Sequence, residues 1–253
     1  MNPRIVAVLN QKGGVGKTTT SVNLCHALAR MGKKLIVIDL DPQSHLSVSF
    51  GVVSTQIGGI DEIMLGVSTL PEKLIKVRPN LDLIVAGSRL QEIEQLNEAG
   101  AQSGYLLRKA LVEHLSGLDF VFIDCPPSSG LLVANALLAA DEILVPMTSD
   151  YLALQGLSHL MGTIRKFESV LNKQYRFSLV MSRYIASRRI SKEVLKTLQK
   201  YFAGKILATT ITETALLAEC PSFGKTIFEY RPGCRSARDF AALANDFLEG
   251  KVM

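Results

Sequence analysis

Long hydrophobic runs are missing from this sequence. The longest strongly apolar stretch, residues 130–140, has 11 residues and is followed by Asp141 and Glu142, so it is too short to cross a bilayer. Residues 1–4 lead directly into an apolar segment, without the charged, apolar and small-residue regions of a signal peptide. We therefore expect a cytoplasmic protein with no transmembrane segment.

Paired cysteines are also missing. The chain has 4 cysteines, which stand far apart and form no C-x-x-C pair that would suggest a metal or redox site. We expect reduced and mostly structural thiols at Cys25, Cys125, Cys220 and Cys234.

Repeats, low-complexity tracts and an obvious interdomain linker are absent as well. A chain of 253 residues with 47% hydrophobic residues can bury a full core. We expect a single domain over residues 1–253, with the Gly- and Ser-containing stretch 51–59 as a mobile loop.

Positive charge is concentrated in one place. The formal net charge is +5, yet the stretch from Arg183 to Lys205 alone carries seven basic residues and one acid, so the rest of the chain is slightly negative.

Short apolar, β-branched segments alternate with stretches of helical periodicity. Near-continuous apolar segments indicate strands that are buried on both faces. The alternation predicts an α/β fold with a doubly wound, largely parallel sheet and helices on both faces. The expected strands are 4–10, 35–39, 81–86, 119–125, 142–147, 177–182 and 206–211, and the expected helices are 17–31, 104–115, 153–171, 191–202 and 235–248.

A glycine-rich loop follows the first expected strand. Residues 9–21, LNQKGGVGKTTTS, match the phosphate-loop pattern G-x-x-x-x-G-K-[ST] except that Gln11 replaces the first glycine and Lys12 adds a second lysine. Glycines at this turn let successive amides point inward, and the following helix adds its positive dipole end, so the loop can cradle phosphate. Lys17 is then expected to reach the β- and γ-phosphates and Thr18 to ligate Mg²⁺.

Acidic residues end two other expected strands. Asp39 and Asp41 lie at and just beyond the end of the second strand, and Asp124 ends the strand 119–125. The carboxyl ends of parallel strands share one sheet edge, so these carboxylates are expected beside the phosphate loop. Asp124 suits the Walker B role of holding Mg²⁺ through a water, and Asp41 suits orienting the attacking water near the metal.

These motifs together carry a specific resemblance. QKGGVGKT at 11–18, DLDPQ at 39–43 and DCPPS at 124–128 resemble the deviant Walker A family of P-loop ATPases, which includes ParA and Soj partition proteins, MinD and the nitrogenase iron protein. The resemblance implies ATP and Mg²⁺ as cofactors and an ATP-driven homodimer, in which Lys12 reaches the nucleotide of the second subunit. It also implies slow ATP hydrolysis, with catalytic roles for Lys12, Lys17 and Asp41, and nucleotide contacts from Lys12, Gly13, Gly14, Val15, Gly16, Lys17, Thr18 and Thr19.

The resemblance to ParA and Soj extends over nearly the whole chain. The segment 219–247 is similar to the C-terminal pattern of those partition proteins. The chain begins at its first strand, as in short ParA forms, so we expect no added N-terminal DNA-reading domain and no sequence-specific operator binding.

The basic stretch is the candidate DNA surface. Lys192, Lys196 and Lys200 fall on one helix face, while Val194, Leu195, Leu198 and Phe202 supply the buried side. By itself this pattern fits a solvated face as well as a ligand site. The resemblance to short ParA proteins favours nonspecific DNA binding through Arg183, Arg188, Arg189, Lys192 and Lys196, with Arg189 as the strongest candidate.

One segment departs from the Soj pattern. Residues 212–222, TETALLAECPS, stand where Soj-like proteins carry a sequence similar to PRNVRLSEAPS, so that Glu213 and Leu216 replace two arginines. This departure implies a DNA surface rebuilt around 183–200, weaker DNA binding, or a different cargo.

The expected function is thus an ATP-switched positioning protein, nucleoid-associated in the cytoplasm, whose hydrolysis a ParB-like or other adaptor stimulates. A MinD-like membrane-cycling regulator is the alternative, but the C-terminal segment carries Asp239, Asp246 and Glu249 and predicts no basic amphipathic helix. An iron–sulfur carrier would need paired thiols at a subunit interface, and only Cys125 suggests one. A metabolic ATPase would need a second-substrate pocket, which the sequence does not indicate.

Overall fold

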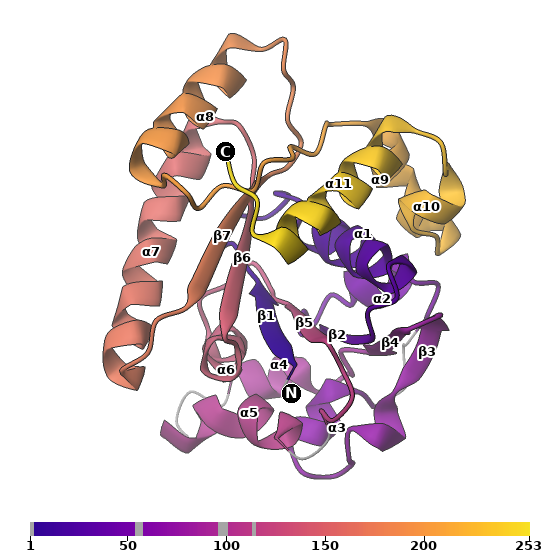
Figure 1. The fold of residues 1–253 in the computed structure, drawn as a ribbon. Coiled ribbons are helices and arrows are strands. Elements are labelled where there is room, and N and C mark those ends of the chain that lie inside the picture. Colours follow the sequence, from indigo (N-terminus) through magenta and orange to yellow (C-terminus); the bar gives the residue numbers. More distant parts are fainter. Residues whose placement is uncertain (1–2, 54–57, 96–100, 113–114) are drawn as a thin grey trace.

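The core of the fold is one seven-stranded sheet. The computed structural model describes residues 3–53, 58–95, 101–112 and 115–253. The strand order is β3-β4-β2-β5-β1-β6-β7 (Figure 1), and every neighbouring pair is parallel except β3 with β4. The strands are β1 (Arg4–Val8), β2 (Leu35–Asp39), β3 (Ile75–Arg78), β4 (Leu81–Ile84), β5 (Phe120–Asp124), β6 (Glu142–Met147) and β7 (Arg176–Met181).

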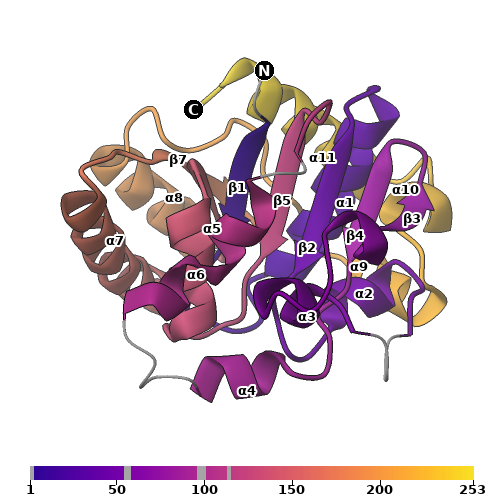
Figure 2. The ribbon, with the colours of Figure 1, turned by 90° about the horizontal axis from the view of Figure 1, so that it is seen from below.

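Helices cover both faces of this sheet (Figure 2). One face carries α1 (Lys17–Arg30), α2 (His45–Ser49), α9 (Ala215–Glu219), α10 (Ile227–Tyr230) and α11 (Arg235–Glu249). The other carries α3 (Ile60–Met64), α4 (Leu90–Gln95), α5 (Leu106–Leu111), α6 (Leu131–Ala139), α7 (Tyr151–Leu171) and α8 (Arg189–Tyr201). Short 3₁₀ turns lie at Pro71–Lys73, Ala101–Tyr105 and Cys220–Phe223.

Side chains of each central strand alternate between two apolar cores. In β5, Phe120 and Phe122 face the core under α1 and α11, whereas Val121 and Ile123 face the core under α6 and α7. A strand covered on both sides needs apolar residues at every position, which explains the unbroken apolar segments in the sequence. The doubly wound, largely parallel sheet predicted from the sequence is confirmed.

The prediction of a strand at 206–211 is wrong. Ile206 forms only an isolated parallel bridge with Leu179 of β7. In the middle of the segment, Ala208 N donates to Lys251 O at 3.2 Å and Thr209 N donates to Asp246 Oδ2 at 2.7 Å. Because the amides in its middle bond to the C-terminal segment, the stretch does not become an eighth strand.

Other boundaries shift less. β3 was not expected, because its sequence IKVR is short and half charged, which is typical of an edge strand. The expected helix 104–115 is reduced to α5, preceded by the 3₁₀ turn, and residues 113–114 lie outside the described residues. Residues 54–57 of the expected loop 51–59 also lie outside them.

The C-terminal helix α11 packs inside the fold. Its residues Phe240, Leu243 and Phe247 are buried in the core that it shares with α1. Its apolar face is therefore already covered by protein. Among the residues described, no helix combines the length and apolar character needed to span a membrane.

A buried histidine joins α1 to α10. His26 Nδ1 lies 2.6 Å from Thr226 Oγ1, and its ring meets Phe228 edge-on at a centroid distance of 5.6 Å. Burial lowers the pKa of His26 from 6.5 to about 4, helped by the positive charges of Arg78 and Arg30 and opposed by Glu229. The folded protein therefore holds His26 neutral at pH 7.

This buried neutral histidine predicts a loss of stability in mild acid. His26 is protonated near pH 6.5 in the unfolded chain and near pH 4 in the folded chain. Its contribution to the free energy of unfolding is therefore complete above pH 6.5 and is lost as the pH falls toward 4. The loss attributable to His26 is at most about 3 kcal/mol. Urea unfolding between pH 4 and 7 should show a shallower acid loss in His26→Gln than in the wild type.

The exposed His159 provides the matched control, since His159→Gln should keep the wild-type slope. Identical pH slopes for His26→Gln and the wild type would contradict the burial argument.

Candidate functional site

A phosphate loop lies at the carboxyl edge of the sheet, between β1 and α1. Gly14 and Gly16 adopt φ values of +73° and +85°, a left-handed region that other residues rarely enter. Gly16 is the residue before the first turn of α1, so the free amides of that turn face the same space as the loop. Gly14 and Gly16 thus occupy positions at which the turn favours glycine.

A cavity of about 650 Å³ opens over this loop. Its floor is the loop and the start of α1, and its walls come from the ends of β2 and β7 and from residues 211–218. Of the expected nucleotide residues, Gly13, Gly14, Gly16, Lys17, Thr18 and Thr19 line the cavity, together with Asp41; Lys12, Val15 and Asp124 do not.

Lys17 is buried at the base of the cavity. Its side chain lies within 3.5 Å of the Lys12 carbonyl oxygen through Nζ, and the residue is only 7% exposed. Burial lowers the pKa of Lys17, and the nearby Asp124 carboxylate partly opposes that shift. A buried lysine beside the free backbone amides at the start of a helix attracts an anion.

Asp124 ties the start of α1 to the end of β5. Its Oδ2 accepts a hydrogen bond from Thr18 Oγ1 at 2.7 Å, and its Oδ1 accepts one from Ser21 Oγ at 2.7 Å. Burial raises the pKa of Asp124 to about 6, while the two hydroxyl donors and Lys17 act in the opposite direction. The predicted strand-end carboxylate therefore contacts the predicted metal-ligating hydroxyl directly.

Asp39 is the neighbour of Asp124 across the sheet. The two residues are paired in the register of β2 and β5. Burial, followed by the charge of Asp124, raises the pKa of Asp39 to about 7. The Asp39 carboxylate is held by the amide and hydroxyl of Ser47, at 2.9 and 2.8 Å, so it anchors α2 rather than the cavity.

The residues at the base of the cavity suit Mg²⁺ together with phosphate. Mg²⁺ is usually bound by one or two carboxylates, a hydroxyl, waters and substrate phosphates. Thr18, Asp41 and Asp124 supply such oxygens, and Asp41 is 8% exposed on the cavity wall. Within the described residues no three His, Cys, Asp or Glu side chains form a metal site by themselves.

Cys125 adds no chemistry to this site. It is buried, and burial together with Asp124 raises the pKa of its thiol. A buried thiol of this kind packs as a small apolar side chain, and the cavity lining does not include it; this agrees with the structural role expected from the sequence.

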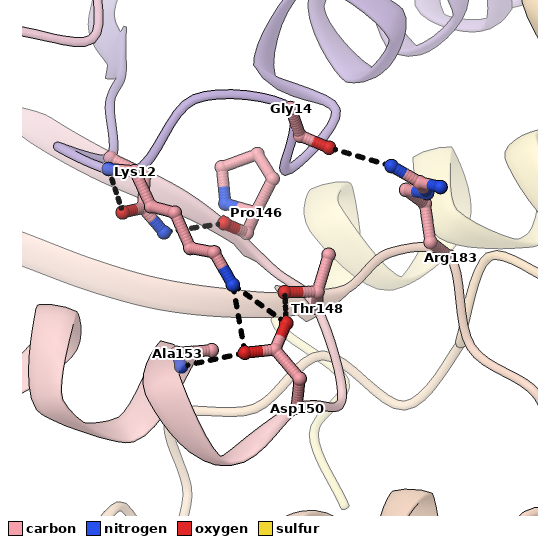
Figure 3. Close-up of polar contacts among 8 residues, drawn as sticks. Lys12, Gly14, Pro146, Thr148, Asp150, Ala153 and Arg183 are labelled. Atoms are coloured by element: carbon pink, nitrogen blue, oxygen red, sulfur yellow. Dashed lines mark hydrogen bonds and ion pairs between the residues drawn. The ribbon is translucent and has the colours of Figure 1, made fainter.

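The side chain of Lys12, the second lysine of the motif, extends to Asp150 (Figure 3), and Lys12 does not line the cavity. Lys12 Nζ contacts both carboxylate oxygens of Asp150, at 2.7 and 2.8 Å. Asp150 is the N-cap of α7 and accepts a hydrogen bond from Ala153 N at 3.0 Å. The Lys12 and Asp150 side chains are 35% and 44% exposed, so the ion pair is open to solvent.

The expected DNA-binding residues fall into two groups. Arg183 lines the cavity and forms an ion pair with Glu213. Arg188, Arg189, Lys192 and Lys196 are exposed on and just before α8, outside the cavity. Arg189 pairs with Glu193 at 2.7 Å, one turn along the helix. The predicted apolar side of this helix is confirmed, because Val194 and Leu198 are buried and Leu195 and Phe202 are partly buried.

Sequence reasoning missed several cavity residues. Ser182 lies directly after β7, and Gln43 and His45 follow β2. Their positions at the carboxyl ends of expected strands were the available signal. The wall formed by 211–218 begins at the end of the expected strand 206–211, so the same rule indicates it, although the structure forms no strand there.

Comparisons with known proteins agree with this geometry. A family model described as an AAA domain matches residues 3–177. The chain is 35% identical over 253 residues to the chromosome partitioning protein ParA of Caulobacter vibrioides, covering 98% of this chain and 95% of that protein. It is 36% identical over 249 residues to the sporulation initiation inhibitor protein Soj of Bacillus subtilis, covering 96% and 97%.

One solved structure of similar fold contains a nucleotide and magnesium. Cobyrinic acid a,c-diamide synthase from Mycobacterium smegmatis, with a bound ATP analogue and magnesium, superimposes with a TM-score of 0.85 at 29% identity and covers 98% of this chain and 94% of that one. The sheet, the phosphate loop and the cavity define a P-loop nucleotide-binding fold. The chain belongs to the ParA/Soj family of partition ATPases.

The position of Lys17 leads to a direct test of nucleotide binding. Lys17→Ala should weaken ATP binding by about a hundredfold or more, because it removes the buried cation that faces the phosphates. The free variant should unfold at the same or a higher temperature, since the desolvated charge is gone. Equilibrium titration with a fluorescent ATP analogue measures the first quantity and thermal unfolding the second. Unchanged ATP affinity would refute the assignment of the loop.

Proposed function

We propose that this chain is an ATP-switched positioning ATPase that acts as one domain over residues 1–253 and partitions a DNA or protein cargo. The observation that carries the proposal is that the two lysines of the loop lie in different surroundings. Lys17 is buried at the base of the cavity, whereas Lys12 lies outside the cavity lining on a solvent-exposed carboxylate. A single subunit's nucleotide needs only the first lysine, which leaves the second for a partner subunit.

In this proposal ATP joins two copies of the chain face to face. Two facing triphosphates repel each other, and a cation donated by each subunit reverses the sign of that interaction. Lys12 would exchange Asp150 for a phosphate of the opposite subunit. The present ion pair is exposed and contributes at most about 1 kcal/mol, so the exchange costs little.

Hydrolysis in this proposal uses the residues at the base of the cavity. Lys17 holds the β- and γ-phosphates and Thr18 supplies a hydroxyl ligand to Mg²⁺, which neutralises phosphate charge when bound. Asp124 orients that hydroxyl from behind through its hydrogen bond, and Asp41 orients the attacking water. The cavity is open to solvent in one subunit, so we expect slow turnover until an adaptor of ParB-like type completes the water site.

The basic surface of α8 is the proposed DNA contact. Arg188, Lys192 and Lys196 form no ion pair with any residue described in the structure. Free exposed cations along one helix bind phosphate backbones without reading base sequence. ATP-driven pairing of two such surfaces would place the protein on the nucleoid and release it after hydrolysis.

Dimerisation is tested by Lys12→Ala. This variant should bind ATP with an affinity close to that of the wild type, but it should lose the ATP-dependent increase in mass, because the cation that bridges the subunits is gone. Light scattering with and without ATP measures the mass. Lys33→Ala, which removes a lysine from the loop after α1, is the matched control and should dimerise normally. Normal dimerisation of Lys12→Ala would remove the cross-subunit role.

DNA binding is tested with random-sequence duplex DNA in ATP, ADP or no nucleotide. Binding should require ATP, and Arg189→Ala should weaken it and reduce its salt slope by about 2, since each lost phosphate contact contributes about 0.9 and the dimer has two copies. Lys166→Ala, an exposed charge on α7, is the control and should bind as the wild type does. An absence of binding with every nucleotide would move the DNA contact to another surface or the function to another ATP-driven task.

A further inference from the structure

Two consecutive carbonyls of the phosphate loop are held by consecutive residues at the end of β7. Ser182 Oγ donates a hydrogen bond to the Val15 carbonyl oxygen at 2.6 Å. Arg183 Nη1 donates one to the Gly14 carbonyl oxygen at 3.1 Å (Figure 3). The loop is thus fastened to β7 through two neighbouring peptide groups rather than through side chains of its own.

Because the peptide group is planar, these two contacts also fix the directions in which two amide N–H groups point. In a trans peptide the carbonyl and the following N–H point in opposite directions. Drawing the carbonyls of Gly14 and Val15 toward β7 turns the N–H groups of Val15 and Gly16 the other way. Neither of these amides donates to a residue within the described ranges. Gly16 lines the cavity, so its amide faces the space that a ligand would fill, whereas Val15 is buried directly before it in the loop.

Arg183 is itself held in an unusual conformation. Its φ is +48°, a region that costs a non-glycine residue about 1 kcal/mol or more. Its neighbours fix the backbone, because Ser182 N donates to Met147 O and Tyr184 N donates to Ile211 O, both at 2.8 Å. The backbone conformation is therefore imposed by the strands and segments on either side.

Glu213 then sets the direction of the Arg183 side chain. Glu213 Oε1 accepts hydrogen bonds from Arg183 Nε at 2.9 Å and Nη2 at 2.6 Å, which leaves Nη1 for Gly14. Glu213 belongs to the cavity wall 211–218, opposite the phosphate loop. Arg183 thus bridges the wall and the loop.

We propose that Ser182, Arg183 and Glu213 are positioning residues that aim the amides of Val15 and Gly16 at the phosphates of a bound nucleotide. The inference rests on the nucleotide site proposed above and deepens it: the phosphate cradle is shaped from outside the motif. It also gives the acid at position 213, which replaces an arginine of the Soj-like pattern, a task at the nucleotide rather than at DNA.

The test compares a ligand that has phosphates with one that lacks them. ADP and adenosine are titrated into the wild type, Ser182→Ala and Glu213→Gln, and the ratio of the two affinities is recorded. Ser182→Ala changes no charge and removes one hydrogen bond, so ADP should bind about fivefold to tenfold more weakly. Adenosine, which does not reach the amides, should bind within twofold of its wild-type affinity.

Glu213→Gln separates positioning from simple charge balance. If Glu213 only cancelled the charge of Arg183, its neutralisation would leave one more positive charge near the phosphates and ADP would bind more tightly. If Glu213 positions Arg183, ADP should bind about threefold or more weakly, and the loss should persist at high salt. Circular dichroism and thermal unfolding confirm that the variants are folded.

The outcomes distinguish the two levels of the proposal. A wild-type protein that does not bind ADP would overturn the nucleotide site itself. Wild-type binding of ADP with an unchanged ratio in Ser182→Ala, or tighter ADP binding in Glu213→Gln, would overturn only the positioning role. If Ser182→Ala does not fold, Arg183→Lys takes its place, since lysine keeps the charge but lacks the fork that joins Glu213 to Gly14. ADP affinity within twofold of wild type in Arg183→Lys would also overturn the role.

Discussion

The hydrogen bonds of the buried Asp124 carboxylate are the contacts on which the rest of the site depends. Both of its oxygens accept from hydroxyls in the first turns of α1, so the end of β5 fixes where α1 begins. The beginning of α1 in turn fixes the phosphate loop and the burial of Lys17. A carboxylate with no access to water is costly unless donors surround it, and here one of the two donors, Thr18, is also the residue that we propose as a metal ligand. Stability and function therefore share the same atoms.

Carboxylates also hold two cations near the rim of the cavity. Lys12 is held by an exposed Asp150, and Arg183 by Glu213 on the cavity wall. Lys12 Nζ makes no other contact with the loop among the described residues. Arg183, by contrast, also donates a hydrogen bond to the Gly14 carbonyl oxygen, and its neighbours fix its backbone conformation. An exposed lysine on one carboxylate can leave it readily, and an arginine with three fixed contacts cannot. One cation is thus suited to exchange partners and the other to hold shape.

The sequence predicts the phosphate loop and the carboxylates at the strand ends, and it misses the side chains that hold the loop from the end of β7. Gly14, Gly16, Lys17 and Thr18 lie within one loop and one helical turn, so their spacing carries their geometry. Asp41 and Asp124 follow from the rule that parallel strands end at one edge. Ser182 and Arg183 reach the loop from more than 160 residues away in the chain, and no local pattern encodes that contact. Glu213 acts on the loop only through Arg183. The segment 206–211 has the composition of a strand, but the amides of Ala208 and Thr209 donate to Lys251 and Asp246 near the C-terminus instead of to a neighbouring strand. Strand propensity does not predict such long-range hydrogen bonds.

Strand β7 connects the two surfaces that the proposed function needs. Its carboxyl end supplies Ser182 and Arg183 to the phosphate loop, and five residues later the chain enters the basic helix with Arg188 and Arg189. Tyr184, between the two, is fixed by its bond to Ile211 on the cavity wall. The order of residues along 182–192 thus places the cations that we propose as DNA contacts a few residues after the side chains that hold the phosphate loop.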